Sequence, residues 1–248
     1  MDFDPVIENL PRLLNGFVLT LELTAISLAC GMVLALPLAL LRVSRNPVLW
    51  VPVYGYIFLF RGTPLLIQIY LIYYGLGQID WIKATFLWAF FQKAYWCALL
   101  AFSLNTAAYN AEILRGAIQA VPHGEIEAAK ACGMSRALVF RRIILPRAFR
   151  LMLPAYSNDV VFTLQATSLA SVVTLLDLTG VARIMVARYF EPYEFFLTIG
   201  VIYLVTTYLI LGIFRWVEHR LSGHMRERSS VRQAKAALTT TQATLPGR

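Results

Sequence analysis

Two of the most apolar stretches of this chain carry polar side chains at helical spacing. Asn105, Tyr109 and Glu112 are four and three residues apart, so a helix would place them on one face. The second stretch carries a stripe with a repeat of four: Asp159, Thr163 and Thr167. Because polar side chains are costly inside a membrane, they usually face a cavity or the interior of a helix bundle. The two stripes therefore predict a hydrated path that contacts a polar solute.

Asp159 is the residue that we expect to bind the charge of a solute, because attraction to a cation at contact distance is about 4 kcal/mol at an effective dielectric of 20. The alternative is a structural acceptor that caps backbone or pairs with Arg147 or Arg150. Glu112 has a similar alternative, since Arg115 lies three residues further on and can pair with it. The remaining candidates for contact with the solute flank the second stripe: Tyr156, Ser157, Asn158, Gln165 and Ser168.

The composition places these stripes in a membrane protein. Of the 248 residues, 58% are hydrophobic and 15% are charged, which is more apolar surface than a soluble domain of this length can bury. A spanning helix needs roughly 20 mostly apolar residues. Five spans are expected, the second of them interrupted at Arg61–Pro64: residues 16–41, 48–76, 95–114, 151–175 and 195–214. Residues 81–91 are apolar but too short to span, so we expect an outer interfacial helix there.

The distribution of charge gives the expected orientation. The net charge is +8, and basic residues gather after the first, third and fifth spans, which the positive-inside bias assigns to the cytoplasm. The N-terminus is then periplasmic and the C-terminus cytoplasmic. We therefore attribute the positive charge to orientation and expect no binding of nucleic acid. Residues 1–228 form the expected transmembrane domain, and the polar residues 229–248 form an expected disordered tail.

The longest cytoplasmic loop, residues 119–147, carries signals for two short helices. Gly133 can end the first helix in a left-handed conformation. Ser135 can cap the second helix, which we expect to run to Leu145 before Pro146 breaks it. Small Ala residues would leave one side of this helix–turn–helix flat enough to enter a groove of another protein. The alternative is an ordinary helical loop between two spans.

The chain lacks the motifs of nucleotide binding and of hydrolytic catalysis. No Gly is followed by Lys, so there is no phosphate-binding loop. His219 and His224 lack the Glu of a zinc-protease helix, and no Gly-x-Ser-x-Gly elbow occurs. Cys30, Cys97 and Cys132 are far apart and have no metal-ligand spacing. We expect no catalysis, metal or cofactor in this chain, so any energy must come from a partner.

The cytoplasmic loop resembles the EAA signature of ABC importer permeases at every defined position. The matching residues are Glu127, Ala128, Ala129, Gly133, Ile143, Leu145 and Pro146. Residues 60–66 and 104–112 look like signatures of the polar amino acid branch of these permeases. The chain is similar to the M-type permeases of histidine/lysine/arginine/ornithine importers and of octopine or nopaline importers. One departure is Asp159, where several relatives have Glu.

The resemblance implies an all-α integral membrane protein with the type I ABC importer permease fold, whose loop is a coupling helix that sits in a cleft of an ATPase subunit. It also implies a Q-type permease as heterodimer partner and two ATPase subunits that bind ATP and Mg. A periplasmic binding protein would deliver a polar, cationic amino acid or an opine. The implied location is the bacterial inner membrane, surrounded by lipid.

Two other functions stay open on the residues alone. An integral membrane enzyme would need paired catalytic groups at one depth, and none stands out in the sequence. A passive channel would not need so structured a loop. Recovery of a stoichiometric ATPase on purification would favour the importer, whereas activity or conductance of the isolated chain would favour the alternatives.

Overall fold

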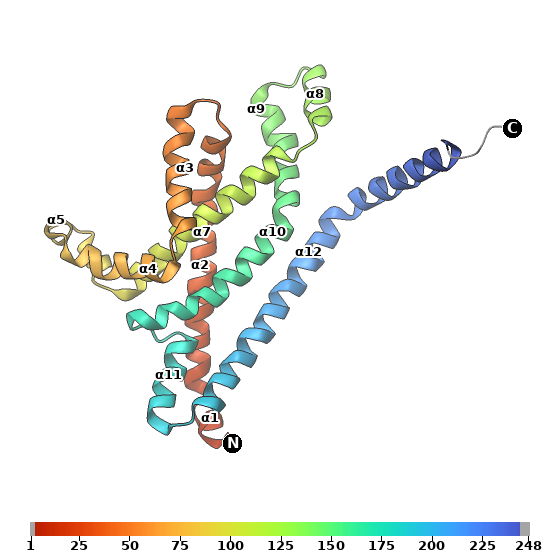
Figure 1. The fold of residues 1–248 in the computed structure, drawn as a ribbon. Helices are drawn as coiled ribbons and strands as arrows, with labels where there is room; N and C mark the ends of the chain where they lie inside the picture. Colours follow the sequence, from red (N-terminus) through yellow and green to blue (C-terminus); the bar gives the residue numbers. More distant parts are fainter. Residues whose placement is uncertain (1–2, 244–248) are drawn as a thin grey trace.

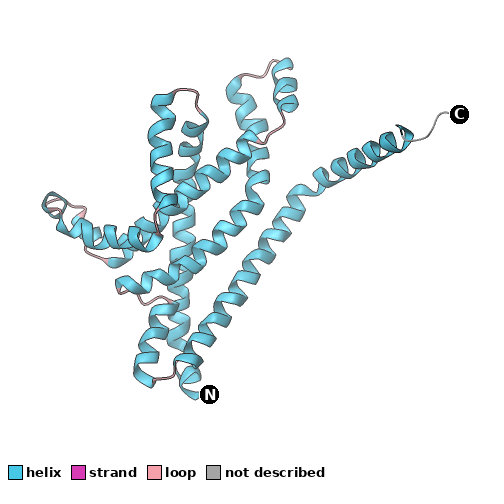
Figure 2. Ribbon diagram, viewed as in Figure 1, coloured by secondary structure: helices cyan, strands magenta, loops and turns pink. Residues whose placement is uncertain are grey.

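The computed structural model describes the backbone of residues 3–243 and the side chains of residues 3–221. Helices account for every regular element of the described part, as Figure 2 shows. The α-helices are α1 (Asp4–Glu8), α2 (Leu10–Val43), α3 (Pro47–Gly62), α4 (Leu65–Tyr70), α5 (Asp80–Lys83), α6 (Trp88–Phe91), α7 (Ala94–Gln119), α8 (His123–Ala131), α9 (Arg136–Val139), α10 (Leu145–Ala166), α11 (Leu178–Tyr189) and α12 (Pro192–Ala243). Short π or 3-10 segments extend some of them: η1 (Leu71–Gly75), η2 (Leu76–Gln78), η3 (Phe140–Ile144) and η4 (Thr167–Val173).

Helices α2 and α7 form the centre of the bundle, and α3 and α10 pack against α7 (Figure 1). The two central helices approach each other closely at Gly31, because a Cβ there would lie 2.8 Å from the Cβ of Thr106. Helix α7 also buries Ala107, Ala108 and Ala111 completely. Small side chains let helix backbones come together inside a membrane. The sequence of α7 thus makes it the helix on which the others converge.

The structure agrees with the expectation of several membrane spans. Helices α2 and α12 are each long and apolar enough to cross a bilayer, and two bent pairs pass the same test together. The bent pairs are α3 with Leu65–Gln78, and Arg136–Val173 with α11. Helix α7 has 26 residues, and its length of about 39 Å exceeds the hydrocarbon thickness of a bilayer. We assign α7 as a further span, the third along the chain. It is less apolar than α2 because of the polar residues that it buries.

The second span is interrupted where the sequence indicated. The chain bends by 107° between α3 and the segment that begins at Leu65. Pro64 precedes this segment and forces Thr63 into an extended conformation, with φ −113° and ψ 144°. The break leaves Arg61 in the last turn of α3, next to the bend.

The second helix of the cytoplasmic loop does not end at Pro146, so that part of our expectation is wrong. Ser135 caps α9 as predicted, by accepting the N–H of Leu138 at 3.4 Å. The helix then continues through the π-helical turn η3 into α10, with Pro146 in the first turn of α10. A π turn is wider than an α turn, which relieves the clash between a proline ring and the carbonyl group of the preceding turn. The loop is therefore joined to α10 by unbroken helix.

The expected outer loop before the fifth span contains a helix that we did not anticipate, α11. Asp177 caps this helix by accepting the N–H groups of Thr179 at 3.1 Å and Gly180 at 3.2 Å. The Thr20 hydroxyl oxygen of α2 accepts the N–H of Leu178 at 3.1 Å. These bonds fix the start of α11 against α2.

Two peripheral segments also differ from the simplest expectation. The expected interfacial helix over residues 81–91 is two short helices, α5 and α6, joined by turns. The backbone of α12 is helical to Ala243, beyond the boundary at which we expected a disordered tail to begin. Ala is the commonest residue between Ser229 and Ala243 and favours helix. Residues 244–248 lie outside the described part, and the division of the chain at residue 228 stays a prediction.

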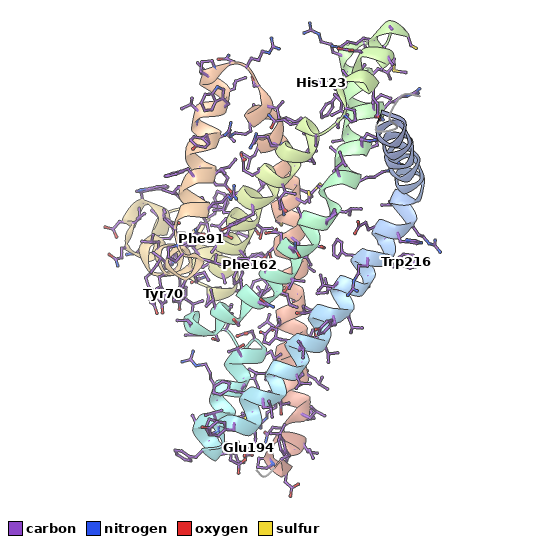
Figure 3. All side chains as sticks on the ribbon, turned by 45° about the vertical axis from the view of Figure 1, so that its right-hand side comes forward. Tyr70, Phe91, His123, Phe162, Glu194 and Trp216 are labelled. Carbon is purple, nitrogen blue, oxygen red and sulfur yellow. The ribbon has the colours of Figure 1, made fainter. Side chains whose placement is uncertain are left out.

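The elements are sorted between two ends of the bundle (Figure 1). Helices α8 and α9 and the connection between α2 and α3 lie at one end, which we call the coupling-loop end. Helices α1 and α11 lie at the opposite end. Figure 3 shows the same separation, with His123 and Glu194 at opposite ends and Phe162 between them.

Candidate functional site

Asp159 occupies a buried position on α10, facing α7. The residue is 7% exposed, and its Oδ2 atom has no hydrogen-bond partner among the described residues. The polar groups that act on its carboxylate are the Arg61 guanidinium and the Asn110 amide. Neither expected structural partner pairs with it, because Arg147 instead lies 3.2 Å from Glu125 and Arg150 is exposed. Asp159 therefore has an unused hydrogen-bond acceptor inside the bundle.

Asn110 adds a second polar group beside this carboxylate. Its side chain is completely buried, and its amide interacts with Asp159, but neither Nδ2 nor Oδ1 makes a hydrogen bond of good geometry within the described part of the chain. An unpaired buried polar group costs about 1–3 kcal/mol. A ligand or water that bonded to Asn110 and Asp159 together would remove this cost. The pair has the polar character expected of a solute contact.

Arg61 lies over the ring of Tyr109, with its Cζ 5.1 Å from the ring centroid. The ring of Tyr109 in turn lies 6.2 Å from that of Phe162, which is exposed. Figure 3 places Phe162 midway along the bundle. Arg61 is also exposed on this face, and a guanidinium at such a depth is stable only where water or protein surrounds it. The face that holds these three residues is therefore suited to a hydrated cavity.

Asn105 has a structural environment, although its spacing placed it in the same stripe as Tyr109. Its Nδ2 donates to Gln68 Oε1 at 3.0 Å and to the carbonyl oxygen of Phe60 at 3.3 Å. Gln68 Nε2 donates to the same carbonyl at 2.8 Å and to both oxygens of Thr63. This network, which we call the Gln68 network, ties the break after α3 to α7. It holds the backbone that carries Arg61.

Glu112 is likewise engaged inside the chain. Its Oε2 accepts from Arg115 Nη2 at 2.7 Å and from Nε at 2.9 Å. Its Oε1 lies 3.3 Å from the Nε of Arg42, at the end of α2. The structural alternative that the sequence offered for Glu112 is therefore the arrangement found, with one more arginine than expected.

The remaining predicted contacts are divided between the interior and the surface of α10. Ser157 and Thr167 are buried and donate to carbonyl oxygens of their own helix, at 2.8 and 2.6 Å. Thr163 is also buried, on the Asp159 stripe. Tyr156 packs edge-on against Phe214 of α12, with ring centroids 5.8 Å apart. The other members are exposed or half-buried and lie beside the stripe: Asn158, Gln165 and Ser168.

The coupling loop has the local geometry that the sequence predicted. Gly133 follows α8 with φ +78°. Its N–H donates to Lys130 O at 2.9 Å, and the N–H of Met134 donates to Ala129 O at 3.2 Å. These two bonds form a Schellman motif, which satisfies carbonyls at the end of the helix. A short second helix, α9, follows directly, so the loop is a compact helix–turn–helix.

Helix α8 presents small and polar side chains to the surroundings. Its exposed residues are His123, Gly124, Glu127, Ala128, Lys130 and Ala131. Ala129 faces inward and is 6% exposed. Exposed Gly133 and Pro146 and half-buried Ile143 and Leu145 complete the signature. The ion pair between Glu125 and Arg147 ties α8 to the start of α10. The loop therefore exposes a surface of small and polar residues, and an ion pair holds it to α10.

Sequence reasoning missed three side chains that shape these sites. Arg61 appeared only at the helix break, whereas its charge acts on Asp159. Gln68 and Arg42 were not singled out, although each bonds to a predicted residue on α7. Gln68, a polar side chain within an apolar run, and Arg42, near the end of α2, were visible signals. Among residues 3–221, no cluster of His, Cys, Asp and Glu is arranged to hold a metal ion.

Comparison with known sequences identifies the family. The model of the family described as binding-protein-dependent transport system inner membrane component matches residues 27–223. The octopine transport system permease protein OccM of Rhizobium meliloti is 52% identical over 223 residues, covering 89% of this chain and 91% of the relative. The nopaline transport system permease protein NocM of Agrobacterium fabrum is 44% identical and covers 96% and 100% of the two chains. The histidine/lysine/arginine/ornithine permease protein HisM of Escherichia coli K12 is 44% identical over 217 residues, or 87% of this chain and 91% of the relative.

Solved structures agree with this result. An amino acid ABC transporter crystallised with histidines matches with a TM-score of 0.79 and 33% identity, over 89% of this chain and 99% of that chain. The methionine ABC transporter MetNI matches in fold, with a TM-score of 0.72 at 21% identity over 86% of this chain and 98% of that chain. The all-α fold of type I ABC importer permeases, which the resemblance implied, is thereby confirmed. The chain belongs to the binding-protein-dependent transport system inner membrane components, the multi-pass permease subunits of ABC importers.

Proposed function

We propose that this permease subunit moves polar, cationic amino acids or amino-acid-derived opines across the bacterial inner membrane. The observation that carries the proposal is the buried Asp159, whose Oδ2 lacks a partner among the described residues and which lies beside Asn110 and Arg61. A carboxylate in this setting can accept the ammonium or guanidinium group of a solute. The names of OccM, NocM and HisM, which transport octopine, nopaline and basic amino acids, support this substrate class.

The proposal includes the partners expected of an ABC importer permease. A periplasmic binding protein would release solute at the α1–α11 end, and two ATPase subunits would bind at the coupling-loop end. ATP and Mg would bind in those subunits. The helical continuity from η3 into α10 supports transmission of movement from the loop to Asp159. In this arrangement the N-terminus is periplasmic and the C-terminus cytoplasmic.

A second permease, of the Q type, completes the path in this proposal. Arg61 and Phe162 are exposed on one chain, so the cavity that they face needs another wall. The similar but distinct partner of an M-type permease would supply it. The enzyme and passive-channel alternatives are not favoured, because the relatives are transport permeases.

Substitution of Asp159 by Asn tests the proposal. The complete complex would be reconstituted in proteoliposomes with its binding protein, and ATP-driven uptake of radiolabelled L-arginine, L-histidine or octopine would be measured. Asp159→Asn keeps the size of the side chain and removes its charge, so we expect assembly to persist and uptake to fall by about tenfold or more, which corresponds to about 1.4 kcal/mol. Asp80→Asn makes the same change at an exposed carboxylate of α5 and should leave uptake unchanged. Wild-type uptake by Asp159→Asn would refute the assigned role.

A further inference from the structure

Five side chains form a cluster at the coupling-loop end of the bundle, which we call the Arg42 cluster: Arg42, Trp50, Tyr54, Glu112 and Arg115. They come from three helices, because Arg42 ends α2, the two aromatic residues belong to α3, and the last two belong to α7. The cluster lies apart from Asp159 and has no part in binding solute in the proposal above.

Arg42 makes every contact in this cluster that crosses between helices. Its Nε lies 3.3 Å from Glu112 Oε1 on α7. Its Cζ lies 4.7 Å from the ring centroid of Tyr54 and 5.4 Å from that of Trp50, both on α3. Arg115 binds the other oxygen of Glu112 from within α7. Removal of Arg42 would therefore separate α2 and α3 from Glu112 and leave the pair inside α7 in place.

A guanidinium is the group suited to this position. It is planar, so it can lie over aromatic rings and still donate to a carboxylate at its edge, which an ammonium group cannot do. The Arg42 and Glu112 side chains are 19% and 14% exposed, so their attraction is less screened than that of a surface pair. Arg42 Nε and Glu112 Oε1 form an ion pair without a hydrogen bond between them.

The helices that Arg42 joins lead to the two sites of the protein. Beyond Glu112, helix α7 continues to Gln119. It is followed within a few residues by α8, the first helix of the coupling loop. Helix α3 runs from the cluster to Arg61, which acts on Asp159. One route from the coupling loop to Arg61 passes through α7, Glu112, Arg42 and α3. Closer to Arg61, α3 and α7 are also joined by the Gln68 network and by the Tyr56 hydroxyl, which donates to the carbonyl oxygen of Leu104 at 2.6 Å.

We propose that Arg42 is a positioning residue for coupled transport. By holding α3 to α7, it makes Arg61 move when the ATPase subunits displace the coupling loop. The inference rests on the proposed function, because it assumes that movement begins at the loop. Without Arg42, α3 and α7 keep fewer contacts near the coupling loop, so each ATP hydrolysed displaces Arg61 less.

The packing of the bundle makes this role separable from folding. Apolar contacts among Ala35 of α2, Val53 and Ile57 of α3, and Ala108 and Ala111 of α7 hold the same three helices together. These residues do not depend on Arg42 for their burial. We therefore expect variants of Arg42 to assemble with the partner subunits.

The test is the number of ATP molecules hydrolysed per solute accumulated, measured on the complete complex in proteoliposomes with the same radiolabelled probes. Arg42→Ala should raise this ratio by about fivefold or more, which is within the usual range of coupling between sites. Arg42→Lys keeps the charge and loses the stacked plane, so its ratio should lie between those of wild type and Arg42→Ala. Glu112→Gln should behave as Arg42→Ala, and the double variant should equal either single variant, because the two residues share one contact.

Arg45→Ala is the matched control, because this exposed arginine lies three residues beyond Arg42 and outside the cluster. Its ratio should equal that of wild type. A wild-type ratio in Arg42→Ala, or in the longer Arg42→Gln where only that variant assembles, would overturn the inference. Failure of both to assemble would also overturn it, by showing a purely structural role. If the wild-type complex hydrolyses ATP and accumulates none of the probes, the proposed function fails instead.

Discussion

The acidic residues of the described part include three with different sets of neighbours: Asp177, Glu112 and Asp159. Asp177 accepts two backbone N–H groups at the start of α11. Glu112 lies against two guanidinium groups. Asp159 retains an oxygen without a partner in the described part of the chain. Because a satisfied carboxylate has little capacity left for a ligand, Asp159 is the one of the three that suits a solute.

The two buried asparagines of α7 provide a further prediction, in which substitution by Ala lowers stability at one position and uptake at the other. Asn105→Ala removes the donor to Gln68 and to Phe60 O, so we expect the free energy of unfolding to fall by about 1–3 kcal/mol. Asn110→Ala removes an amide that interacts with Asp159 but makes no hydrogen bond of good geometry among the described residues, so the unfolding free energy should change less while uptake falls. Thermal unfolding of the purified complex and uptake in proteoliposomes measure the two effects. If Asn110→Ala loses more unfolding free energy than Asn105→Ala, the structural role belongs to Asn110 and the assignment made here is wrong.

Spacing along one helix predicted which residues share a face. It did not predict which of them are held by structural contacts and which are left to bind a solute. Asn105, Tyr109 and Glu112 do lie on α7, yet their partners come from α4, α3 and α2. No local pattern indicates which distant side chain will arrive beside a given residue. The pairing of Glu112 with Arg115 was predictable because both residues lie on one turn of helix. Its second partner, Arg42, required the tertiary structure.

At the scale of elements, the coupling loop is the part whose shape depends most on a single backbone conformation. Gly133 has φ +78°, and a Cβ added there would meet nothing within 4 Å. Any cost of substitution is therefore a cost of the left-handed conformation, about 1–2 kcal/mol for most residues. Asn adopts this conformation more readily than other residues with a side chain.

We therefore predict a graded response at Gly133. Gly133→Ala should weaken recovery of the ATPase with the complex and lower uptake, and Gly133→Asn should restore much of both. Gly200→Ala, on the exposed side of α12, is the control, because a Cβ there also meets nothing and its backbone does not have positive φ. Co-purification and ATP-driven uptake are the measurements. Equal behaviour of Gly133→Ala and Gly200→Ala would show that the turn is not what the partner requires.

Local signals predicted elements well wherever the chain itself supplied the cause. The break at Pro64, the turn at Gly133 and the cap at Ser135 each follow from the conformational limits of one residue. Pro146 was misjudged because a π turn, set by the continuation of η3 into α10, accommodates a ring that would break a regular helix. Helix α11 was missed because its basic residues suggested a loop, although Asp177 was a visible cap signal.

At the scale of the whole molecule, the isolated chain leaves broad apolar surfaces uncovered. Exposed residues on α12 include Leu204, Tyr208 and Ile213, as expected where lipid surrounds a span. The face with Arg61 and Phe162 is different, because a guanidinium lies among its aromatic rings. Lipid suits the first surface, and a second permease with enclosed water suits the second. The chemistry of the two surfaces thus supports the proposed second permease at the Arg61 face, with α12 facing lipid.

The orientation of the whole molecule leads to a prediction that needs no substrate. Cys132 is exposed at the end of α8, in the coupling loop, whereas Cys97 is buried and Cys30 lies within the α2 span. If the loop is cytoplasmic, a maleimide that cannot cross membranes should label the chain in inside-out vesicles and not in intact spheroplasts. Cys132→Ser should abolish the label, which excludes the other two thiols as its source. Added ATPase subunit should protect Cys132, because the thiol lies at the end of the helix that we expect to enter the cleft of that subunit. Labelling in intact spheroplasts would reverse the orientation, and undiminished labelling with bound ATPase would place the contact elsewhere on the chain.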